Sequence, residues 1–273
     1  MGLVNGSVLG CATNNKFGQR AFQTMSKVFL VNVGANTKHS GMARSPVFPD
    51  GSFHYVSFPH PGLLGRRPYP GAIRRFTRNV DPWHTHFDPD WENLTYGDSC
   101  LNRRSLALRR VAVGDTLLFW GLLWRNIGQQ WVDFTGERGW YFIGVLRIDQ
   151  ILLEGQVPAE AGPANARRAA KNVHFSGGTL EAGNRVFIGN PTYSALFPKA
   201  VDLEATRTSG LLFKTIRTAD GHRLKLYGKR NWTSSTRACR VIWDLDMSQE
   251  RARANIVRAA ILRQAGQDIL RDL

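Results

Sequence analysis

The sequence predicts an α+β protein built on a curved, mainly antiparallel sheet or small barrel, with peripheral helices and a C-terminal helix. Short apolar runs at 28–34 and 240–245, rich in β-branched residues, predict buried strands. Between them, a Gly-Asp turn at Gly114 leads into the apolar run 116–121, and the run 140–148 predicts its antiparallel partner. Glycines inside both runs indicate bends or close backbone approach, which a curved sheet requires.

The region before this central hairpin predicts a second hairpin and a long irregular stretch. Runs at 45–48 and 53–58 flank a Pro-Asp-Gly-Ser turn at 49–52, a pattern typical of a β-hairpin whose aromatic residues cover a core. Residues 59–104 are rich in Pro, Arg, His and Trp without regular periodicity, and a loop of that length in a compact domain indicates a functional role. Residues 101–111 predict a short basic helix.

The two central strands are expected to be joined by a polar loop at 125–139. After the second strand, the sequence predicts further sheet elements and a C-terminal helix. Residues 172–175 and 185–189 read as short strands, and 211–227 as a hairpin around Ala-Asp-Gly. Ser248 is expected to cap the C-terminal helix. Its apolar positions follow helical spacing: Ile256, Val257, Ala260, Ile261 and Ala265.

Charge points to a polyanionic partner. The 273 residues carry 36 Lys and Arg against 21 Asp and Glu, a formal net charge of +15, while 42% hydrophobic content excludes a disordered chain. DNA is the favoured partner because Lys and Arg neutralise phosphates; mere solubility and an acidic protein partner are the alternatives. The candidate DNA-binding residues are paired basic side chains: Arg66, Arg67, Arg74, Arg75, Arg103, Arg104, Lys229 and Arg230.

Three widely spaced cysteines form neither a disulfide framework nor a paired metal motif, which favours a reducing cytoplasm. No apolar run approaches the length of about 20 residues that a membrane helix needs. Residues 1–24 are Gly- and Asn-rich and predict a disordered leader or a misassigned start, with Met25 as the alternative start. Residues 25–273 are then expected to form a single α+β domain.

The segment 83–91 concentrates the groups able to do chemistry. His84, His86, Asp88 and Asp90 share one parity and would project to one side of an extended backbone. His86, Asp88 and Asp90 are candidate acid-base catalysts. His84, His86 and Asp88 are candidate ligands of a divalent metal, the one cofactor the sequence suggests, with His174 the best distant addition. Ordinary hydrogen-bonded loop residues are the favoured alternative to a metal site.

Cys100 is a candidate nucleophile if a neighbouring His or Arg lowers the pKa of its thiol. Its alternative is a small buried hydrophobic residue. The chain has no Walker motif, no Rossmann glycine fingerprint, no Gly-x-Ser-x-Gly elbow and no zinc-deaminase motif, which argues against the commonest nucleotide enzymes.

Four segments together resemble a known family. They are 44–51, 86–90, 114–121 and the strand that ends at Leu146, and in this order they resemble the third type of nucleotide-modification-associated domain, found with DNA base hypermodification systems. The resemblance spans roughly 27–150, with a weaker part near 187–203. The loop that follows the first strand departs from it, because a more basic sequence is expected there.

The resemblance implies an enzyme that acts on a modified nucleobase in DNA, together with other proteins of a DNA-modification gene cluster. One option is hydrolysis or hydration of a base substituent, such as conversion of a nitrile to an amide on a 7-deazaguanine. The candidate substrate-binding residues lie in the resembling segments and beside them: Asn32, Arg44, Ser45, Asp50, His84, Trp120 and His174.

Two other functions remain open. The hairpin 113–148 is similar to the small barrels of the pseudouridine-synthase-like superfamily, which bind modified bases in an aromatic cage, so a non-catalytic reader is the first alternative. A restriction component that binds modified DNA is the second. The tryptophans between 83 and 140 are expected to lie mostly in the core, with one or two available to stack on a base.

Overall fold

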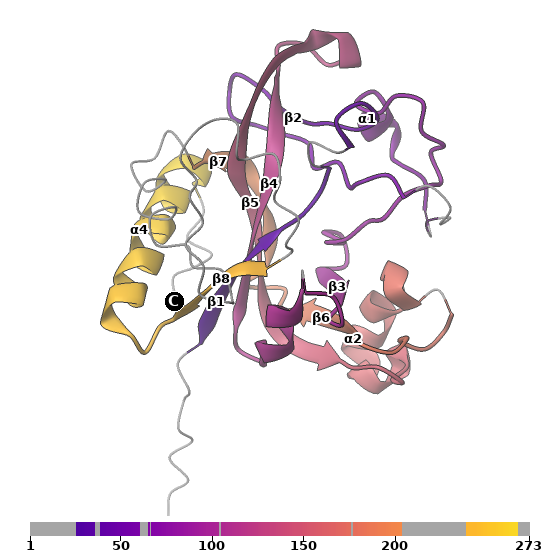
Figure 1. Cartoon of the computed structure of the whole chain (residues 1–273), viewed down its shortest axis with the longest axis vertical. Coiled ribbons are helices and arrows are strands. Elements are labelled where there is room, and N and C mark those ends of the chain that lie inside the picture. Colours follow the sequence, from indigo (N-terminus) through magenta and orange to yellow (C-terminus); the bar gives the residue numbers. More distant parts are fainter. Residues whose placement is uncertain are drawn as a thin grey trace, which may run out of the picture.

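The computed structural model describes residues 26–35, 39–60, 65, 67–103, 105–175, 177–203 and 239–266. Within them, eight strands form one curved sheet whose main path runs β3-β6-β5-β4-β1-β8, with β2 added to β4 and β7 to β5 (Figure 1). The path has two ends, at β3 and β8, so the described strands form an open sheet rather than a closed barrel. The predicted α+β class with a curved, mainly antiparallel sheet is confirmed.

The centre of the sheet is the predicted antiparallel hairpin of β4 (Thr116–Asn126) and β5 (Phe134–Leu152). Asp115 fixes the turn before β4, because its carboxylate accepts hydrogen bonds from the backbone N–H groups of Lys27 and Ala112. The prediction of a loop at 125–139 is wrong for most of its length. Strand pairing continues to Asn126 and Phe134, and the long twisted arm projects beyond the rest of the sheet in Figure 1.

The strands predicted near the two ends of the chain are neighbours in the sheet. β1 (Lys27–Asn32) pairs in parallel with β4 and antiparallel with β8 (Cys239–Asp244). Alternate β1 side chains enter two separate cores: Val28 and Leu30 lie on the side covered by the C-terminal helix, and Phe29 and Val31 lie on the other. A strand buried on both faces explains why its sequence is a continuous apolar run.

The C-terminal helix α4 (Ser248–Ala265) covers one face of the sheet (Figure 1). The expected apolar positions are buried, apart from Ile256, which is 39% exposed and points away from the sheet. The prediction that Ser248 caps the helix is wrong. Met247 occupies the cap position without a side-chain hydrogen bond, and Ser248 is the first helical residue.

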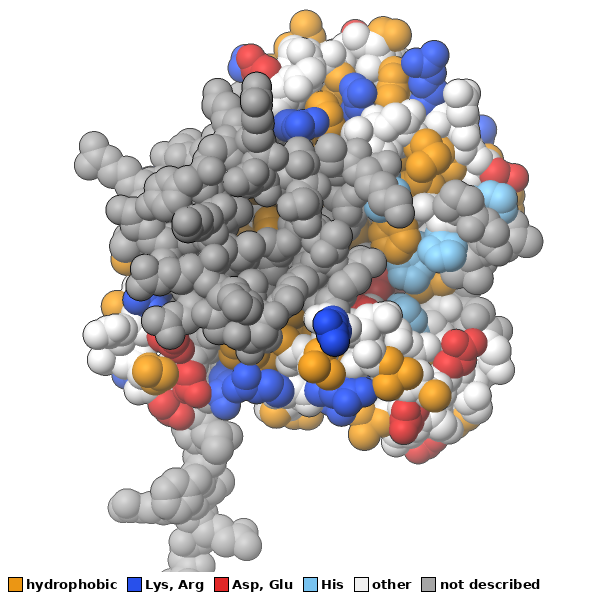
Figure 2. All heavy atoms as spheres, viewed as in Figure 1, with side chains coloured by type: hydrophobic (Ala, Val, Ile, Leu, Met, Phe, Trp, Pro, Cys, Tyr) orange, Lys and Arg blue, Asp and Glu red, His pale blue; other side chains and the backbone are white. Residues whose placement is uncertain are grey.

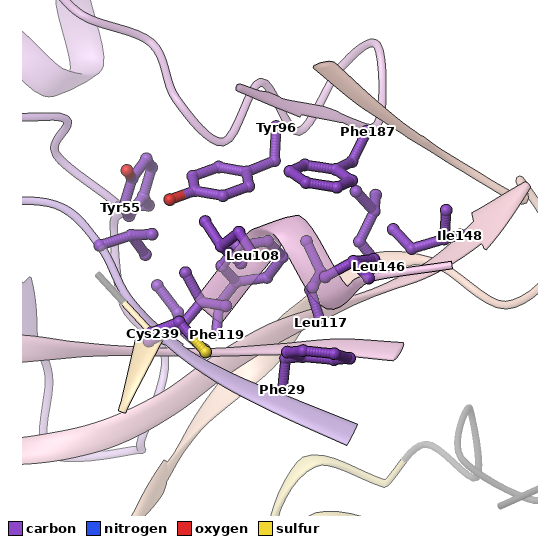
Figure 3. Close-up of a cluster of buried hydrophobic side chains, with 14 of the residues drawn as sticks. Phe29, Tyr55, Tyr96, Leu108, Leu117, Phe119, Leu146, Ile148, Phe187 and Cys239 are labelled. Atoms are coloured by element: carbon purple, nitrogen blue, oxygen red, sulfur yellow. The ribbon is translucent and has the colours of Figure 1, made fainter. Parts of the chain in front are cut away.

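The core on the opposite face is rich in aromatic side chains. Figure 3 shows Tyr96 and Phe187 side by side above Phe119, with the Tyr96 hydroxyl turned toward Tyr55. Tyr96 belongs to β3 (Thr95–Ser99), and Phe187 to its antiparallel partner β6 (Asn184–Gly189). This core joins the sheet to the loops that carry the candidate functional residues.

Several peripheral predictions need correction. β2 (Ser45–Val47) pairs in parallel with β4, but residues 53–58 form no second hairpin arm, only one bridge between Phe53 and Val47. The Val56 N–H group is bound by the Ser45 hydroxyl, and the Val56 carbonyl accepts hydrogen bonds from that hydroxyl and from the Ala35 N–H, so this segment is tied to neighbouring segments.

The remaining elements are short. β7 (Ala195–Asp202) pairs with β5, and the helices α1 (Gly71–Arg74) and α2 (Gly162–Ala169) lie at the periphery. The helix predicted at 101–111 is a 3₁₀ turn at Leu106–Arg110, and the strand predicted at 172–175 is a 3₁₀ turn at Val173–Phe175. Two further 3₁₀ turns span Trp131–Asp133 and Pro158–Ala161.

Two predicted segments lie outside the described residues, namely the leader at 1–24 and the hairpin at 211–227. In the part of the chain that the structure describes, no helix combines the length and the apolar character needed to cross a bilayer.

Candidate active site around Asp88

A buried carboxyl group meets two imidazoles at the end of the loop 82–94. One Asp88 oxygen, Oδ2, lies 3.3 Å from His174 Nε2 and 3.9 Å from His86 Nε2. The other oxygen, Oδ1, accepts a hydrogen bond of 2.8 Å from the Gly97 N–H. His86, Asp88 and His174 each offer one donor atom, and these atoms all lie within 4.8 Å of one another. We call these three residues the Asp88 cluster.

The backbone around Asp88 is held at three points. The Asp88 N–H donates to the His86 carbonyl at 2.9 Å, which makes a tight turn and brings the two side chains together. The Tyr55 hydroxyl donates to the Asp88 carbonyl at 2.9 Å. Because Gly97 lies in β3, its bond to the carboxyl ties the loop to the sheet.

His174 approaches Asp88 from a separate part of the chain. The Asn172 side chain orients it, since its oxygen accepts the His174 N–H at 3.0 Å and its amide donates to the Thr95 hydroxyl at 3.0 Å. The imidazole packs directly over Gly97, where an added Cβ would overlap the ring. Glycine is therefore required at position 97 for His174 to reach the carboxyl.

Burial shifts the protonation of all three groups. Burial raises the pKa of Asp88 to about 6, against the opposing hydrogen bonds from His174 and Gly97. Burial also lowers the pKa of His174, but its hydrogen bond to Asp88 and the charge of that carboxylate outweigh burial and hold the pKa above its ordinary value. The Asp88–His174 pair therefore holds a proton near neutral pH.

His86 stays neutral under the same conditions. Burial, followed by the nearby His174 and His60, lowers its pKa to about 3. Its Nδ1 atom is buried and has no hydrogen-bond partner among the described residues. The Asp88 cluster thus combines a proton-carrying pair with a neutral imidazole of low basicity, so the pair is the part of the cluster suited to acid-base chemistry.

Solvent reaches the cluster from the histidine side. The side chains of His86 and His174 are each 15% exposed, whereas that of Asp88 is 3% exposed. The exposed residue His60 lies beyond His86 with a ring separation of 6.0 Å, and the Phe58 ring contacts His86 at 4.7 Å. Figure 2 shows histidine side chains gathered on one part of the surface. The carboxyl group therefore lies beneath a partly exposed rim of imidazoles.

The structure does not bring His84 and Asp90 into the Asp88 cluster. Asp90 is buried and bound instead by the Arg67 guanidinium at 2.8 Å and the Asn93 amide at 2.7 Å. The backbone turns at 83–88 and the bridge from Asp90 to Thr95 break the extended course that shared parity assumed. Asp90 therefore organises the turn before β3.

Cys100 also lies apart from the Asp88 cluster. It is buried at the end of β3, and burial, together with the charge of Asp98, raises the pKa of its thiol to about 11. A protonated thiol is a poor nucleophile, so this geometry disfavours the catalytic role considered for Cys100.

Most of the candidate substrate-binding residues make structural contacts. The Asn32 amide donates to the Trp120 carbonyl, and Trp120 itself is buried in the helix-side core. Ser45 bonds the Val56 backbone, and Asp50 accepts hydrogen bonds within its exposed turn. Of the seven candidates, His174 alone belongs to the Asp88 cluster.

Arg44 occupies an aromatic setting at the base of the β4–β5 arm. Its guanidinium carbon lies 4.6 Å from the Trp124 ring centroid, 4.7 Å from that of Trp131 and 5.4 Å from that of Phe134. Burial, followed by the charge of Arg138, lowers the pKa of Arg44. The residue therefore stabilises the arm through cation–π contacts.

The basic candidates divide into engaged and exposed side chains. Arg67 pairs with Asp90 and Glu92, and Arg75 donates to the Gln129 side chain. Arg74 and Arg103 are exposed to solvent. The other basic candidates lie outside the described residues: Arg66, Arg104, Lys229 and Arg230.

Residues 27–250 match the protein family described as nucleotide modification associated domain 3. The chain belongs to this family. The match to nucleotide modification associated domain 3 confirms the expected resemblance and extends it well beyond residue 150, so it includes both halves of the Asp88 cluster. The family description links the chain to nucleotide modification. No curated protein and no solved structure is detectably similar to the chain.

Several residues of the candidate site were not predicted from the sequence. Gly97, Asn172 and His60 support or flank the Asp88 cluster, and Tyr55 was expected only to fill the core. A usable signal exists for Gly97, because a glycine inside a strand often marks close approach of another group. Asn172 carries no comparable signal in the sequence.

Proposed function

We propose that this chain is an enzyme of a DNA modification system and that it acts on a modified nucleobase at the Asp88 cluster. One observation carries the proposal: a carboxyl group buried beneath two imidazoles, with its pKa raised to about 6, in a member of a nucleotide modification family. Strongly perturbed titratable groups that contact one another and reach solvent are typical of catalytic sites.

The reaction that these groups support best is addition of water to a base substituent. The neutral His86 imidazole, with its pKa lowered to about 3, orients the attacking water through a hydrogen bond. The Asp88 carboxylate accepts one proton as the water oxygen bonds to the substituent carbon, and protonated His174 gives one proton to the substituent nitrogen. The imidic acid that forms becomes an amide when its hydroxyl proton moves to the same nitrogen. Conversion of a nitrile to an amide on a 7-deazaguanine fits this sequence of transfers.

Three tryptophans of the central hairpin do not form the aromatic cage of a reader, whereas Trp83 in the loop 82–94 is 49% exposed. Trp120, Trp124 and Trp140 are 6%, 5% and 3% exposed, and their rings fill the core. They are therefore not available to stack on an extruded base. A reader and a restriction component are kept as outcomes of the experiment below.

Mass spectrometry of nucleosides tests the proposal. Cells that carry the modification genes receive the wild-type chain, His86→Gln, Asp88→Asn or His174→Gln, with His84→Gln as the matched control from the same loop. We expect one base to change with the wild type and the control, and at least a hundredfold less product with each cluster variant.

A second assay separates the competing functions. Purified chain is mixed with modified plasmid DNA, and both the DNA length and its nucleosides are measured. Cleavage of the DNA would indicate a restriction component, and retention of unchanged DNA would indicate a reader. If every cluster variant is folded and still yields as much changed base as the wild type, catalysis at the Asp88 cluster is refuted.

A further inference from the structure

We infer that the Asp88 cluster is a binding site for one divalent transition-metal ion, held by His86, Asp88 and His174. Two imidazoles and one carboxylate are a ligand set suited to zinc or ferrous iron, and three protein ligands leave coordination positions open for water. The inference rests on the proposed function for its chemical use, but the binding site stands on geometry alone.

The separations between the donor atoms fit an ion of this kind. In a tetrahedral zinc site with bonds of about 2.0–2.1 Å, neighbouring ligand atoms lie about 3.3 Å apart. Asp88 Oδ2 already lies 3.3 Å from His174 Nε2 and 3.9 Å from His86 Nε2. All three donor atoms lie within 4.8 Å of one another, so the wider separations must shorten by up to about 1.5 Å for one ion to bind all three.

The unsatisfied His86 ring is a second, independent observation. The distance of 3.9 Å from His86 Nε2 to Asp88 Oδ2 is too long for a hydrogen bond, and Nδ1 has no hydrogen-bond partner among the described residues. A buried polar ring without hydrogen bonds is costly. A metal ion bound at Nε2 would give this ring a strong polar interaction on the side that faces Asp88 and His174, while Nδ1 stays without a partner among the described residues.

The groups around the three ligands are arranged as supports of a metal site. The Gly97 N–H occupies Asp88 Oδ1 and leaves Oδ2 directed at the two imidazoles, which sets a carboxylate that binds through one oxygen. Asn172 fixes the backbone of His174, and the Tyr55 hydroxyl fixes that of Asp88. Outer contacts of this type orient ligands and strengthen metal binding.

The metal ligands differ from those that spacing in the sequence favours. His84 and His86 form a His-x-His pair, yet His84 lies outside the cluster and His174 takes the third position from a distant segment. When bound, the ion would replace the proton of the Asp88–His174 pair, and the three residues would act as ligands instead of acid-base groups. The ion would lower the pKa of a coordinated water, and the bound hydroxide would then be the nucleophile of the proposed hydration.

Zinc binding by the untagged chain tests the inference. The protein is treated with a chelator, dialysed and titrated with Zn²⁺ in a calorimeter, and its metal content is then measured by mass spectrometry. Cobalt is substituted in parallel, because its visible spectrum reports the number and type of ligands. We expect one ion per chain, with a tetrahedral or five-coordinate cobalt spectrum.

The variants compare two histidines of one loop. His86→Gln and Asp88→Asn are expected to weaken zinc binding at least tenfold, whereas His84→Gln should match the wild type. Circular dichroism identifies any variant that fails to fold. The number of zinc ions bound per wild-type chain tests the inference even if a variant does not fold. Less than a tenth of an ion per wild-type chain would overturn the inference, as would equal losses in His84→Gln and His86→Gln.

The two proposals can fail separately. A chain that binds one zinc ion at these residues and changes no nucleoside would refute the proposed function and leave the metal site standing. A chain that binds no zinc and still changes a base after exhaustive chelation would refute the metal site alone.

Discussion

Replacement of Gly97 by alanine tests the packing on which the Asp88 cluster depends. A Cβ at this position would overlap the His174 ring, so the imidazole must retreat by more than about 1 Å to restore an ordinary contact distance. If strand β3 moved instead, the hydrogen bond from the Gly97 N–H to the Asp88 carboxyl would break. Both responses separate His174 from Asp88.

The cost follows from the contact that is lost. Overpacking of a filled site costs about 1–3 kcal/mol, and loss of a hydrogen bond to a charged group costs about 1.5–3 kcal/mol. Because one response relieves the need for the other, we expect Gly97→Ala to lower the unfolding free energy by about 1–3 kcal/mol. We also expect at least a tenfold loss of zinc affinity.

Urea unfolding and zinc titration measure the two effects. Gly71→Ala is the matched control, because Gly71 is exposed and has no neighbouring atom within 4 Å of the added Cβ. It should change the unfolding free energy by less than about 0.5 kcal/mol. Wild-type stability and wild-type zinc affinity in Gly97→Ala would show that His174 does not need the space over the glycine, and the account of the site would be wrong.

Three further predictions concern protonation, the cysteine and DNA. The pKa of His86 is about 3 in the metal-free folded chain and near 6.5 when unfolded. Because only the unfolded chain binds this proton between these pH values, the free energy of unfolding decreases as pH falls from 6.5 toward 3. His86→Gln should therefore abolish about 2 kcal/mol of the drop in unfolding free energy between pH 7 and pH 5, measured in urea with a chelator; an unchanged drop would contradict a buried neutral imidazole. Cys100→Ala should lower stability by about 1 kcal/mol yet leave the modified nucleosides unchanged, and loss of modification in a folded variant would restore the thiol as a nucleophile. Alanine at the exposed Arg74 and Arg103 should weaken DNA binding and reduce the slope of log K against log salt by about 2, with the ion-paired Arg125 replaced as control; fluorescence anisotropy at several salt concentrations measures this, and an unchanged slope would exclude phosphate contacts there.

The predictable parts of the fold are the strands whose burial requires a run of apolar residues. β1, β4, β5 and β8 are apolar runs because the sheet is covered on both faces. β3 was missed because its sequence, Thr95–Ser99, mixes a glycine and polar residues, and it is a strand only through its pairing with β6. Pairing between distant segments leaves no local periodicity.

The residues of the candidate site were likewise predictable only where neighbours in the sequence are also neighbours in the structure. The spacing of His86 and Asp88 predicted that their side chains are neighbours, but a tight turn brings them together and not the extended backbone that shared parity assumed. His84 and Asp90 share that spacing but were separated by local hydrogen bonds that the sequence does not reveal. His174 was noted as a distant candidate, yet only the fold places its ring against the carboxyl.

The position of β1 between β4 and β8 has a consequence for biosynthesis. The ribosome releases β1 early, but the strand that covers its second edge emerges only after nearly the whole family-matched region has been translated. Until then a nascent chain presents an open, strongly apolar strand edge, which is a template for aggregation. Fragments that stop before Cys239 should therefore depend on chaperones or form inclusion bodies, even though the residues of the Asp88 cluster are already present.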